Sequence, residues 1–298
     1  MVPITLLIKR DQPAGFFSNF LWVLNGLDRA EKSGRVPAIE MTAVTRPSSV
    51  VSVLLKRDQA AYDFERYFCL VGAKMQGHSE QSEFEILEQN QDIAGFMRTG
   101  TEYVGGVYRQ SLRTTDWVQE VLQDVRTVLD LRGNDYVAVH SRYSDMRWTP
   151  SHPTPPNPGQ VLDASVQEAR RLGDKTIFIS ADNQKVIRNF QQSQNEGLEV
   201  LSLNYYSGKF ADILRGDPNL SVLIEALILS ESASFVHSVS SVSFAARVLR
   251  SDSNWTRVSF DCGTNSSRLP LAVLNVYRRS LMGAIGKSKC EVSIYDSK

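Results

Sequence analysis

The strongest sign of chemistry in this sequence is a short polar run that follows an apolar stretch. After the apolar residues 137–139 come His140, Arg142 and Asp145, spaced two and three positions apart. Arginine suits a diphosphate because its planar guanidinium donates two parallel hydrogen bonds and keeps its charge at any working pH. A structural alternative is equally open, in which Arg142 and Asp145 form a loop ion pair and His140 ends a strand.

A second polar run is rich in serine and comes where another apolar stretch, residues 234–238, leads into an amphipathic one. A helix that begins there would present free backbone N–H groups and a partial positive charge, and the hydroxyls would add donors for phosphate oxygens. Ordinary N-capping by a serine would explain the same residues without a ligand. His237 lies inside the expected strand and is predicted to be structural. The serines of this run are Ser238, Ser240, Ser241 and Ser243.

Two acidic residues stand next to apolar stretches. Glu225 interrupts the apolar run 222–229, and Asp182 follows the apolar run 177–181. Each carboxylate either faces solvent or turns into a pocket, where it could accept N–H groups. The sequence leaves both alternatives open.

A third candidate loop, Gly15-Phe16-Phe17, joins an expected strand to an expected helix, where a glycine allows a ligand to approach the backbone closely. The chain has neither a G-x-G-x-x-G nor a Walker A sequence. Their absence argues against a dehydrogenase and against a P-loop NTPase.

The elements that must position these residues alternate between short apolar runs and longer amphipathic ones, which predicts an α/β protein with parallel sheets. In the first half we expect strands at 4–8 and 36–41, with a helix between them capped by Ser18 and ended by Gly34. Residues 42–110 give no topology, and five of the eleven prolines, within 150–158, predict an extended loop. Strands are expected at 136–140, 176–180, 198–203, 235–238 and 257–260. Helices are expected at 116–131, 161–172, 184–194, 219–230, 241–250 and 269–282.

Length and composition narrow the possible classes. A chain of 298 residues suggests two domains, and 33 basic side chains balance 33 acidic ones, so no global attraction for nucleic acid or an anionic membrane exists. The N-terminal apolar stretch is too short for a signal peptide or a membrane span, and we predict a soluble, cytoplasmic protein. The three scattered cysteines, Cys69, Cys262 and Cys290, predict neither a disulfide framework nor a zinc cluster. Sequons at Asn219, Asn254 and Asn265 are expected to be unused.

Taken together, the motifs resemble the α1,6- and protein O-fucosyltransferase superfamily. The resemblance lies in H-x-R-x-x-D at 140–145, in V-S-S-x-S at 239–243 and in the acidic Glu225, sixteen residues before Ser241. Residues 15–19 with the following helix and the Pro37 strand look like that superfamily's N-terminal loop. Residues 62–68 and 176–182 are similar to its aromatic segment and to a strand that ends in aspartate. The resemblance covers most of the chain, although each motif is short.

The resemblance implies a GT-B fold with two facing Rossmann-like domains and parallel sheets. The N-terminal domain, 1–115, would face the acceptor, and the C-terminal domain, 116–268, would bind the nucleotide-sugar. Residues 269–298 would form a helix and tail that pack back on the N-terminal domain. The implied activity is inverting and metal-independent transfer of a sugar, most often L-fucose from GDP-fucose, to a hydroxyl of a glycan or glycoprotein. Neither a metal nor a cofactor other than the donor is implied.

Carried over by position, Arg142 would bind the β-phosphate with support from His140, and Ser240, Ser241 and Ser243 would bind the diphosphate. Glu225 would accept guanine N–H groups, although family members usually have aspartate there. Asp145 is the nearest carboxylate to act as general base, and His152 is the alternative. The remaining donor-binding candidates are Gly15, Phe16, Phe17, Asp182 and Ser238.

Two other functions remain open. One keeps the fold and changes the donor, to another GDP-sugar or to a UDP-sugar such as UDP-xylose. The other is a nucleotide- or glycan-binding protein without turnover.

Overall fold

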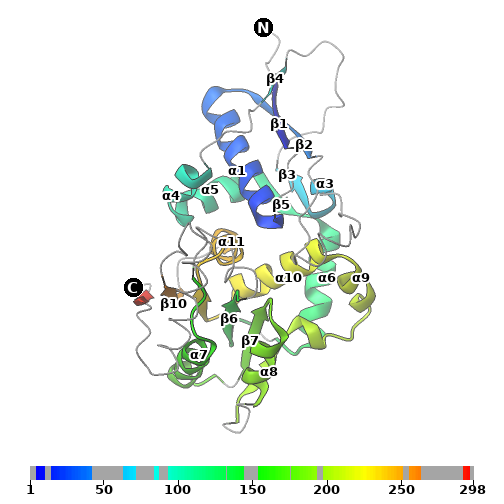
Figure 1. The fold of residues 1–298 in the computed structure, drawn as a ribbon. Coiled ribbons are helices and arrows are strands. Elements are labelled where there is room, and N and C mark those ends of the chain that lie inside the picture. Colours follow the sequence, from blue (N-terminus) through cyan, green and yellow to red (C-terminus); the bar gives the residue numbers. More distant parts are fainter. Residues whose placement is uncertain are drawn as a thin grey trace, which may run out of the picture. The chain divides into compact units, whose positions relative to one another are not determined.

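The computed structural model describes eleven segments of the chain, which divide into two compact units. One unit comprises residues 1–120 with 247–251, and the other comprises 121–246 with 252–298. Figure 1 shows the elements of both, and each unit is described by itself. The described residues are 5–10, 15–41, 63–71, 84–86, 93–131, 133–143, 154–174, 176–192, 197–250, 255–262 and 291–295.

The first unit is built on a small parallel sheet, in which β1 pairs with β2 on one side and with β4 on the other. The helix α1 connects β1 to β2 and buries its apolar residues against them. It packs closely because Gly26 has no side chain; a Cβ there would lie 2.7 Å from Ile8. The elements are β1 (Thr5–Arg10), α1 (Phe16–Ser33), β2 (Val36–Met41) and β4 (Phe84–Ile86).

The helix α1 corrects one prediction about its start. Gly15, in extended conformation, is the N-cap residue, and Ser18 already lies within the first turn. The predicted stop is confirmed, because Gly34 is left-handed, with φ 64°, and its N–H bonds the carbonyls of Ala30 and Glu31. A residue with a side chain would be strained in that conformation.

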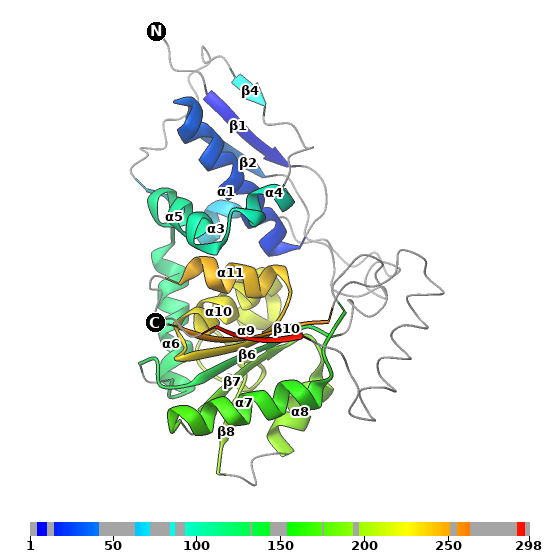
Figure 2. The same ribbon diagram turned by 90° about the vertical axis from the view of Figure 1, so that its left-hand side faces the viewer.

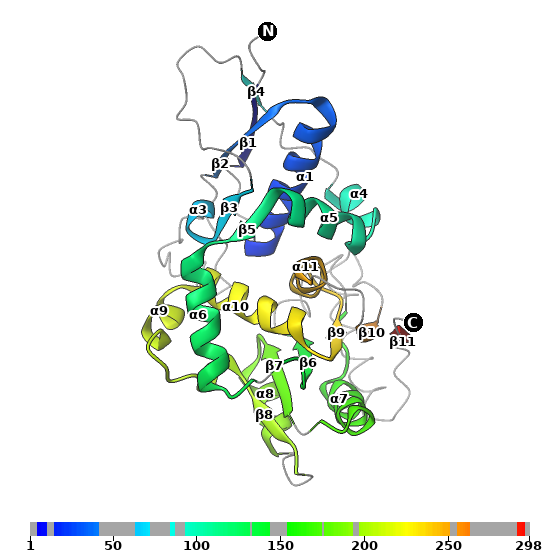
Figure 3. The ribbon, with the colours of Figure 1, turned by 180° about the vertical axis from the view of Figure 1, so that it is seen from behind.

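Between β2 and α6 (Asp116–Val128), the other elements of the first unit that the structure describes are short, and the sequence did not predict them. Figure 3 shows α4 and α5 beside α1, and β3 pairs antiparallel with β5. A buried aromatic cluster joins α1 to this part, with Phe68 stacked on Phe20 and on Phe64. The elements are α3 (Phe64–Tyr67), β3 (Phe68–Leu70), α4 (Ile93–Arg98), α5 (Thr101–Ser111) and β5 (Leu112–Thr114).

The second unit is a six-stranded sheet in the order β11-β10-β9-β6-β7-β8. All neighbouring strands run parallel except β11, which is antiparallel to β10. The chain moves from β6 outward through β7 to β8 and then returns to the other side of β6 with β9 and β10. The strands are β6 (Val137–Ser141), β7 (Thr176–Ala181), β8 (Glu199–Leu201), β9 (Ser234–Ser238), β10 (Thr256–Asp261) and β11 (Glu291–Tyr295).

Helices cover both faces of this sheet. In Figure 2, α7 and α8 lie on one face and α10 lies on the other. Alternate residues of β6 and β7, such as Val139 and Ile179, pack under α7 and α8 in an apolar core. The helices of this unit are α6 (Asp116–Val128), which crosses the boundary between the units, α7 (Pro158–Leu172), α8 (Gln184–Gln192), α9 (Ala211–Gly216), α10 (Pro218–Glu231) and α11 (Ser241–Leu249).

The α/β class with a mostly parallel sheet is confirmed, and the predicted strands and helices of the second half are observed with shifted ends. The prediction for β8 was too long, because Ser202 leaves the strand and its hydroxyl accepts the N–H of Asn204 at the start of the 3-10 helix η2 (Leu203–Tyr205). Residues 154–157 of the proline-rich stretch form neither helix nor strand, with Asn157 in extended conformation, and Pro158 then begins α7. Residues 150–153 lie outside the described residues. The helix expected at 269–282 lies outside the described residues.

The structure also bears on the predictions about the cysteines and the sequons. Cys262 is disulfide-bonded, whereas Cys69 is a free thiol and Cys290 lies outside the described residues. The cytoplasmic location stays a prediction. Asn219 is only 4% exposed within α10, and its sequon is therefore closed to glycosylation in the folded chain. In the described part of the chain, no helix is long and apolar enough to cross a membrane.

Candidate active site

The strand order places a topological switch point between β6 and β9. From β6 the chain goes on to β7, and β9 returns to the opposite side of β6, so the connections leave the carboxyl ends of these two strands in opposite directions. In open α/β sheets, ligands bind outside the carboxyl ends at such a point. The sequence motifs that begin at His140 and at Ser238 follow these two strand ends.

The segment that follows β6 is held by two neighbouring strands. The backbone N–H of Arg142 donates to Ser238 Oγ at the end of β9, with a distance of 3.2 Å. The N–H of Tyr143 donates to Asp182 Oδ1 after β7, at 2.7 Å. Three of the predicted site residues, Arg142, Ser238 and Asp182, are thus brought together. Asp182 and Ser238 fix the backbone that carries the arginine.

The serine turn before α11 forms a reciprocal cap. Ser243 N–H donates to Ser240 Oγ and Ser240 N–H donates to Ser243 Oγ, both at 3.0 Å. This is the capping-box arrangement with serine in the place of the usual glutamate. The N-capping alternative is therefore realised. It leaves the N–H groups of the first turn, at Ser241 and Val242, as donors without an intrahelical acceptor.

His140 connects this turn to the neighbouring strand. Its Nε2 lies 2.9 Å from Ser240 Oγ, and its Nδ1 lies 3.4 Å from Ser180 Oγ on β7. Burial, together with smaller electrostatic contributions from Arg142 and His237, lowers the pKa of His140 to about 3. The imidazole is therefore neutral at physiological pH. The neutral ring donates a hydrogen bond from one nitrogen and accepts one at the other, but it adds no positive charge to the site.

Glu225 turns toward the sheet, which decides between the two orientations that the sequence left open. Ser180 Oγ donates to Glu225 Oε2 at 2.8 Å. Burial raises the pKa of Glu225 to about 7; the carboxylate of Asp182 also raises it, and the hydrogen bond from Ser180 opposes the shift. Glu225 forms no ion pair among the described residues, and its pKa of about 7 leaves this partly buried carboxyl group near half ionisation at neutral pH.

The predicted N-terminal loop belongs to the first unit. Gly15 is exposed, but the rings of Phe16 and Phe17 are buried and contact each other edge to face at 5.0 Å. These side chains pack in the core, and a donor-binding role for this loop stays a prediction. Next to them Asn19 is fully buried, and neither polar atom of its amide has a hydrogen-bond partner among the described residues.

Several predicted residues cannot be placed, and one important residue was missed. Asp145 and His152, the candidate general bases, lie outside the described residues. His237 lies within β9 as predicted, buried and with its ring stacked on Phe235 at a centroid distance of 4.6 Å, which fits the predicted structural role. Ser180 was overlooked because it resembles any small residue in a strand. The signal that could have found it is the register, in which Ser180 is the β7 partner of His140.

The described residues contain no group of three or more histidine, cysteine, aspartate or glutamate side chains that could hold a metal ion. Metal independence stays a prediction, as does the absence of a cofactor.

Comparison with known proteins gives matches at the level of structure alone. Neither a protein-family model nor a curated protein matches the sequence. A NodZ α1,6-fucosyltransferase structure soaked with GDP-fucose aligns with a TM-score of 0.54 and 13% identity, over 99% of this chain and 100% of that one. The fucosyltransferase NodZ from Bradyrhizobium aligns with a TM-score of 0.52 and 11% identity, over all of both chains. POFUT1 in complex with GDP aligns with a TM-score of 0.54 and 13% identity, over 83% of this chain and 95% of that one.

The chain has the GT-B fold of these fucosyltransferases. The resemblance that the motifs suggested is thus supported by the structure, although identities of 11–13% carry the fold and not the activity. Within this GT-B fold, the second unit holds the switch point and the residues gathered around it.

Proposed function

We propose that the chain is an inverting, metal-independent glycosyltransferase that transfers L-fucose from GDP-fucose to a hydroxyl of a glycan or glycoprotein. The observation that carries this proposal is the switch point between β6 and β9, where Arg142 is held by Ser238 next to the capped N-terminus of α11. The structural neighbours support the donor, since the NodZ and POFUT1 structures were determined with GDP-fucose and GDP.

In this proposal the positive end of α11 and the Arg142 guanidinium bind the diphosphate. Sugar transfer passes through an oxocarbenium-like state, as in glycoside hydrolysis, while negative charge grows on the leaving diphosphate. Donors that are fixed before the reaction stabilise that charge without reorganising. The hydrogen bonds from the Arg142 N–H to Ser238 and from the Tyr143 N–H to Asp182 hold this backbone in place and so provide the preorganisation.

Glu225 recognises the guanine base in the proposal. Its Oε2 accepts from Ser180, and its other oxygen has no partner among the described residues. An ionised carboxylate can accept two N–H groups of a base, and binding would therefore favour the ionised form. Asp145 is proposed as the general base, with His152 as the alternative.

Ligand-dependent unfolding tests the donor class directly. The expected result is that GDP and GDP-fucose raise the melting temperature, because a ligand at a hundred times its Kd stabilises by about 2.7 kcal/mol. UDP and UDP-xylose serve as the matched comparison. Stabilisation by the uridine nucleotides alone would overturn the GDP assignment and favour a UDP-sugar transferase of the same fold.

Transfer and donor hydrolysis decide between an enzyme and a binding protein. Incubation with GDP-fucose and a panel of glycan and glycopeptide acceptors should release GDP. Binding of GDP-fucose with neither transfer nor hydrolysis would replace the proposal with a non-catalytic nucleotide-binding function.

A further inference from the structure

A continuous row of hydrogen bonds connects the two ends of the candidate site. It runs from Glu225 on α10 through Ser180 on β7 and His140 on β6 to Ser240 at the cap of α11. The heavy-atom distances along the row are 2.8, 3.4 and 2.9 Å. His140, Ser180 and Ser240 are each less than 9% exposed, so water does not compete for these groups.

The row can hold its protons in only one order when Glu225 is ionised. The carboxylate accepts, so Ser180 gives it the single hydroxyl proton. Ser180 Oγ can then only accept from His140, which places the imidazole proton on Nδ1. Nε2 is left bare and accepts the hydroxyl proton of Ser240. In this state the proton of Ser240 points into the protein.

Protonation of Glu225 reverses every bond in the row. The carboxyl O–H donates to Ser180 Oγ, Ser180 donates to His140 Nδ1, and the imidazole proton moves to Nε2 and donates to Ser240 Oγ. The hydroxyl proton of Ser240 then leaves the row, where Ser243 Oγ at 3.3 Å or an anion can accept it. One proton is taken up, and no other group changes its charge.

We infer that Ser180 is a positioning residue that transmits the protonation state of Glu225 to Ser240 through the tautomer of His140. The carboxyl group at one end of the row thereby sets whether the hydroxyl at the other end can donate to an anion. The row itself does not depend on the proposed function, but its use rests on it. Ionised Glu225, the form that accepts the guanine N–H groups, turns the Ser240 proton away from the diphosphate, so the row couples the two recognitions in opposition.

The charges around the row fit this behaviour. Burial brings the pKa of Glu225 to about 7, so the group changes state near neutrality. Burial keeps the pKa of His140 at about 3, so the imidazole stays neutral and changes only its tautomer. The charged or titratable groups that act on these two are Asp182 after β7, Arg142 after β6 and His237 on β9. Arg142 keeps its charge throughout.

Nitrogen-15 NMR of the histidine-labelled full chain tests the row without a ligand, since the protonated and bare ring nitrogens have different shifts. The His140 signal is assigned by its absence from His140→Gln. The expected result is an Nδ1–H tautomer at about pH 8 and an Nε2–H tautomer at about pH 6, which bracket the pKa of Glu225. In Ser180→Ala the tautomer should no longer change with pH. A pH-independent tautomer in the wild type would overturn the inference.

Binding of inorganic pyrophosphate tests the consequence. Affinity is measured by calorimetry at about pH 6 and about pH 8 for the wild type and Ser180→Ala. The ligand's own ionisation is the same for both proteins and cancels in the ratio of the two pH effects. One hydrogen bond to an anion predicts that the wild type gains about tenfold more affinity on acidification than the variant does.

Two control variants separate the row from general damage. Ser165→Ala removes an equally buried hydroxyl on α7, which donates to the Val161 carbonyl and takes no part in the row. This variant should show the same pH effect on pyrophosphate affinity as the wild type. Ser180→Thr keeps the hydroxyl and should restore the pH effect. Equal pH effects in the wild type and Ser180→Ala would overturn the coupling.

The two assays fail separately. A pH-dependent tautomer without binding of pyrophosphate or GDP would contradict the proposed function and leave the row intact. Normal binding with a fixed tautomer would contradict the row alone.

Discussion

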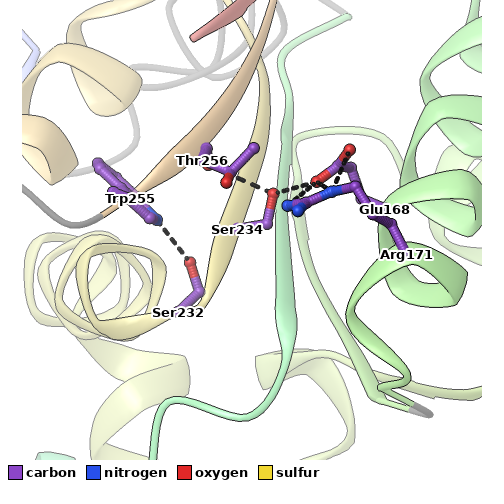
Figure 4. Close-up of polar contacts among 6 residues, drawn as sticks. All are labelled: Glu168, Arg171, Ser232, Ser234, Trp255 and Thr256. Carbon is purple, nitrogen blue, oxygen red and sulfur yellow. Dashed lines mark hydrogen bonds and ion pairs between the residues drawn. The ribbon is translucent and has the colours of Figure 1, made fainter. Parts of the chain in front are cut away.

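The sheet of the second unit has a partly buried polar cluster at each end, and the two clusters use similar residues differently. The carboxyl-end cluster consists of Glu225, Ser180, His140 and Ser240. The amino-end cluster consists of Glu168, Arg171, Ser234 and Thr256, shown in Figure 4. Each contains a glutamate from a covering helix that accepts a hydrogen bond from a strand serine.

The amino-end cluster satisfies its own charge. Glu168 Oε2 accepts from Ser234 Oγ at 2.9 Å and from the Arg171 guanidinium at 2.9 Å, and Arg171 Nε reaches the same carboxylate at 3.2 Å. Ser234 also bonds the Thr256 carbonyl. Because the Arg171 guanidinium and Ser234 already donate to the Glu168 carboxylate, it has few lone pairs left to accept another hydrogen bond.

The glutamate of the carboxyl-end cluster, by contrast, can still accept further hydrogen bonds. It has one serine partner and no cation among the described residues, and the histidine of the cluster is neutral. The two carboxylates therefore differ in their remaining capacity for hydrogen bonds, because Glu168 is paired with an arginine and Glu225 is not. In the proposed function, the raised pKa of Glu225 near a strand end at the switch point fits a carboxylate that binds a ligand.

The largest expected effect separates the two arginines. Arg142→Ala should lower the rate of transfer about 10²- to 10³-fold, because one preorganised donor to the leaving charge is lost. Arg171→Ala, in the amino-end cluster, should leave the rate unchanged and cost about 1 kcal/mol of stability or less, since Arg171 is half exposed. Transfer from GDP-fucose and urea unfolding measure the two quantities. A rate equal to that of the wild type in folded Arg142→Ala would end the assignment of this arginine.

The next effect concerns the pH dependence of stability at Glu225. Its folded pKa of about 7 lies above the unfolded value of 4.5, so its contribution is complete below pH 4.5 and is lost as the pH rises through 7. Glu225→Gln cannot ionise. Its stability relative to the wild type should therefore increase with pH across this window, by on the order of 3 kcal/mol.

Urea unfolding at pH values below and above this window measures the difference. His140 acts in the opposite sense, since its folded pKa of about 3 removes stability as the pH falls below 6.5, but it is present in both proteins and cancels. Glu168→Gln is the matched control and should lose stability, because it breaks a pair with arginine. A constant difference between Glu225→Gln and the wild type would show that Glu225 is ionised like an exposed carboxylate.

A smaller effect is expected from the amino-end carboxylate itself. Glu168→Ala should cost about 2 kcal/mol, because Ser234 and Arg171 lose a buried, charged acceptor. The affinity for GDP should not change, since the cluster lies at the other end of the strands. Denaturant unfolding and calorimetry give the two values, and a loss of GDP affinity in the folded variant would break the division between the two ends.

Much of the second unit could be predicted because buried parallel strands have continuous apolar stretches in their sequence. The strands at β6, β7 and β9 were recognised in this way. The edge strand β11 was missed, since an exposed antiparallel strand has no such composition. In the first unit, the short elements around Phe68 are held by aromatic packing. Such packing produces no helical or strand-like periodicity of apolar residues in the sequence, so these elements could not be predicted.

The site was predictable only to the extent that its chemistry is local. Arg142 and the serines before α11 stand in contiguous motifs that follow strand ends. Ser180 contributes through register, which joins residues forty positions apart, and the orientation of Glu225 depends on how α10 rotates on the sheet. Sequence patterns mark the strand ends, but tertiary packing decides which side chains meet there.

The smallest effect tests whether the amino end is structural throughout. Trp255 Nε1 donates to Ser232 Oγ at 3.3 Å, beside the amino-end cluster (Figure 4), and the indole stacks on Phe235 with centroids 4.9 Å apart. Ser232→Ala removes two neutral hydrogen bonds, the one from Trp255 and the one that Ser232 Oγ donates to the Leu229 carbonyl at 3.0 Å. It should cost about 1 to 2 kcal/mol, while the stacking remains. Phe235 precedes His237 and Ser238 on β9, so a displacement of the Trp255 indole could shift the residues at the carboxyl end of this strand as well. Unchanged GDP affinity in Ser232→Ala, with the expected loss in urea unfolding, would show that β9 isolates its two ends. A parallel fall in affinity would mean that the strand transmits strain, and the two clusters would then have to be treated as one.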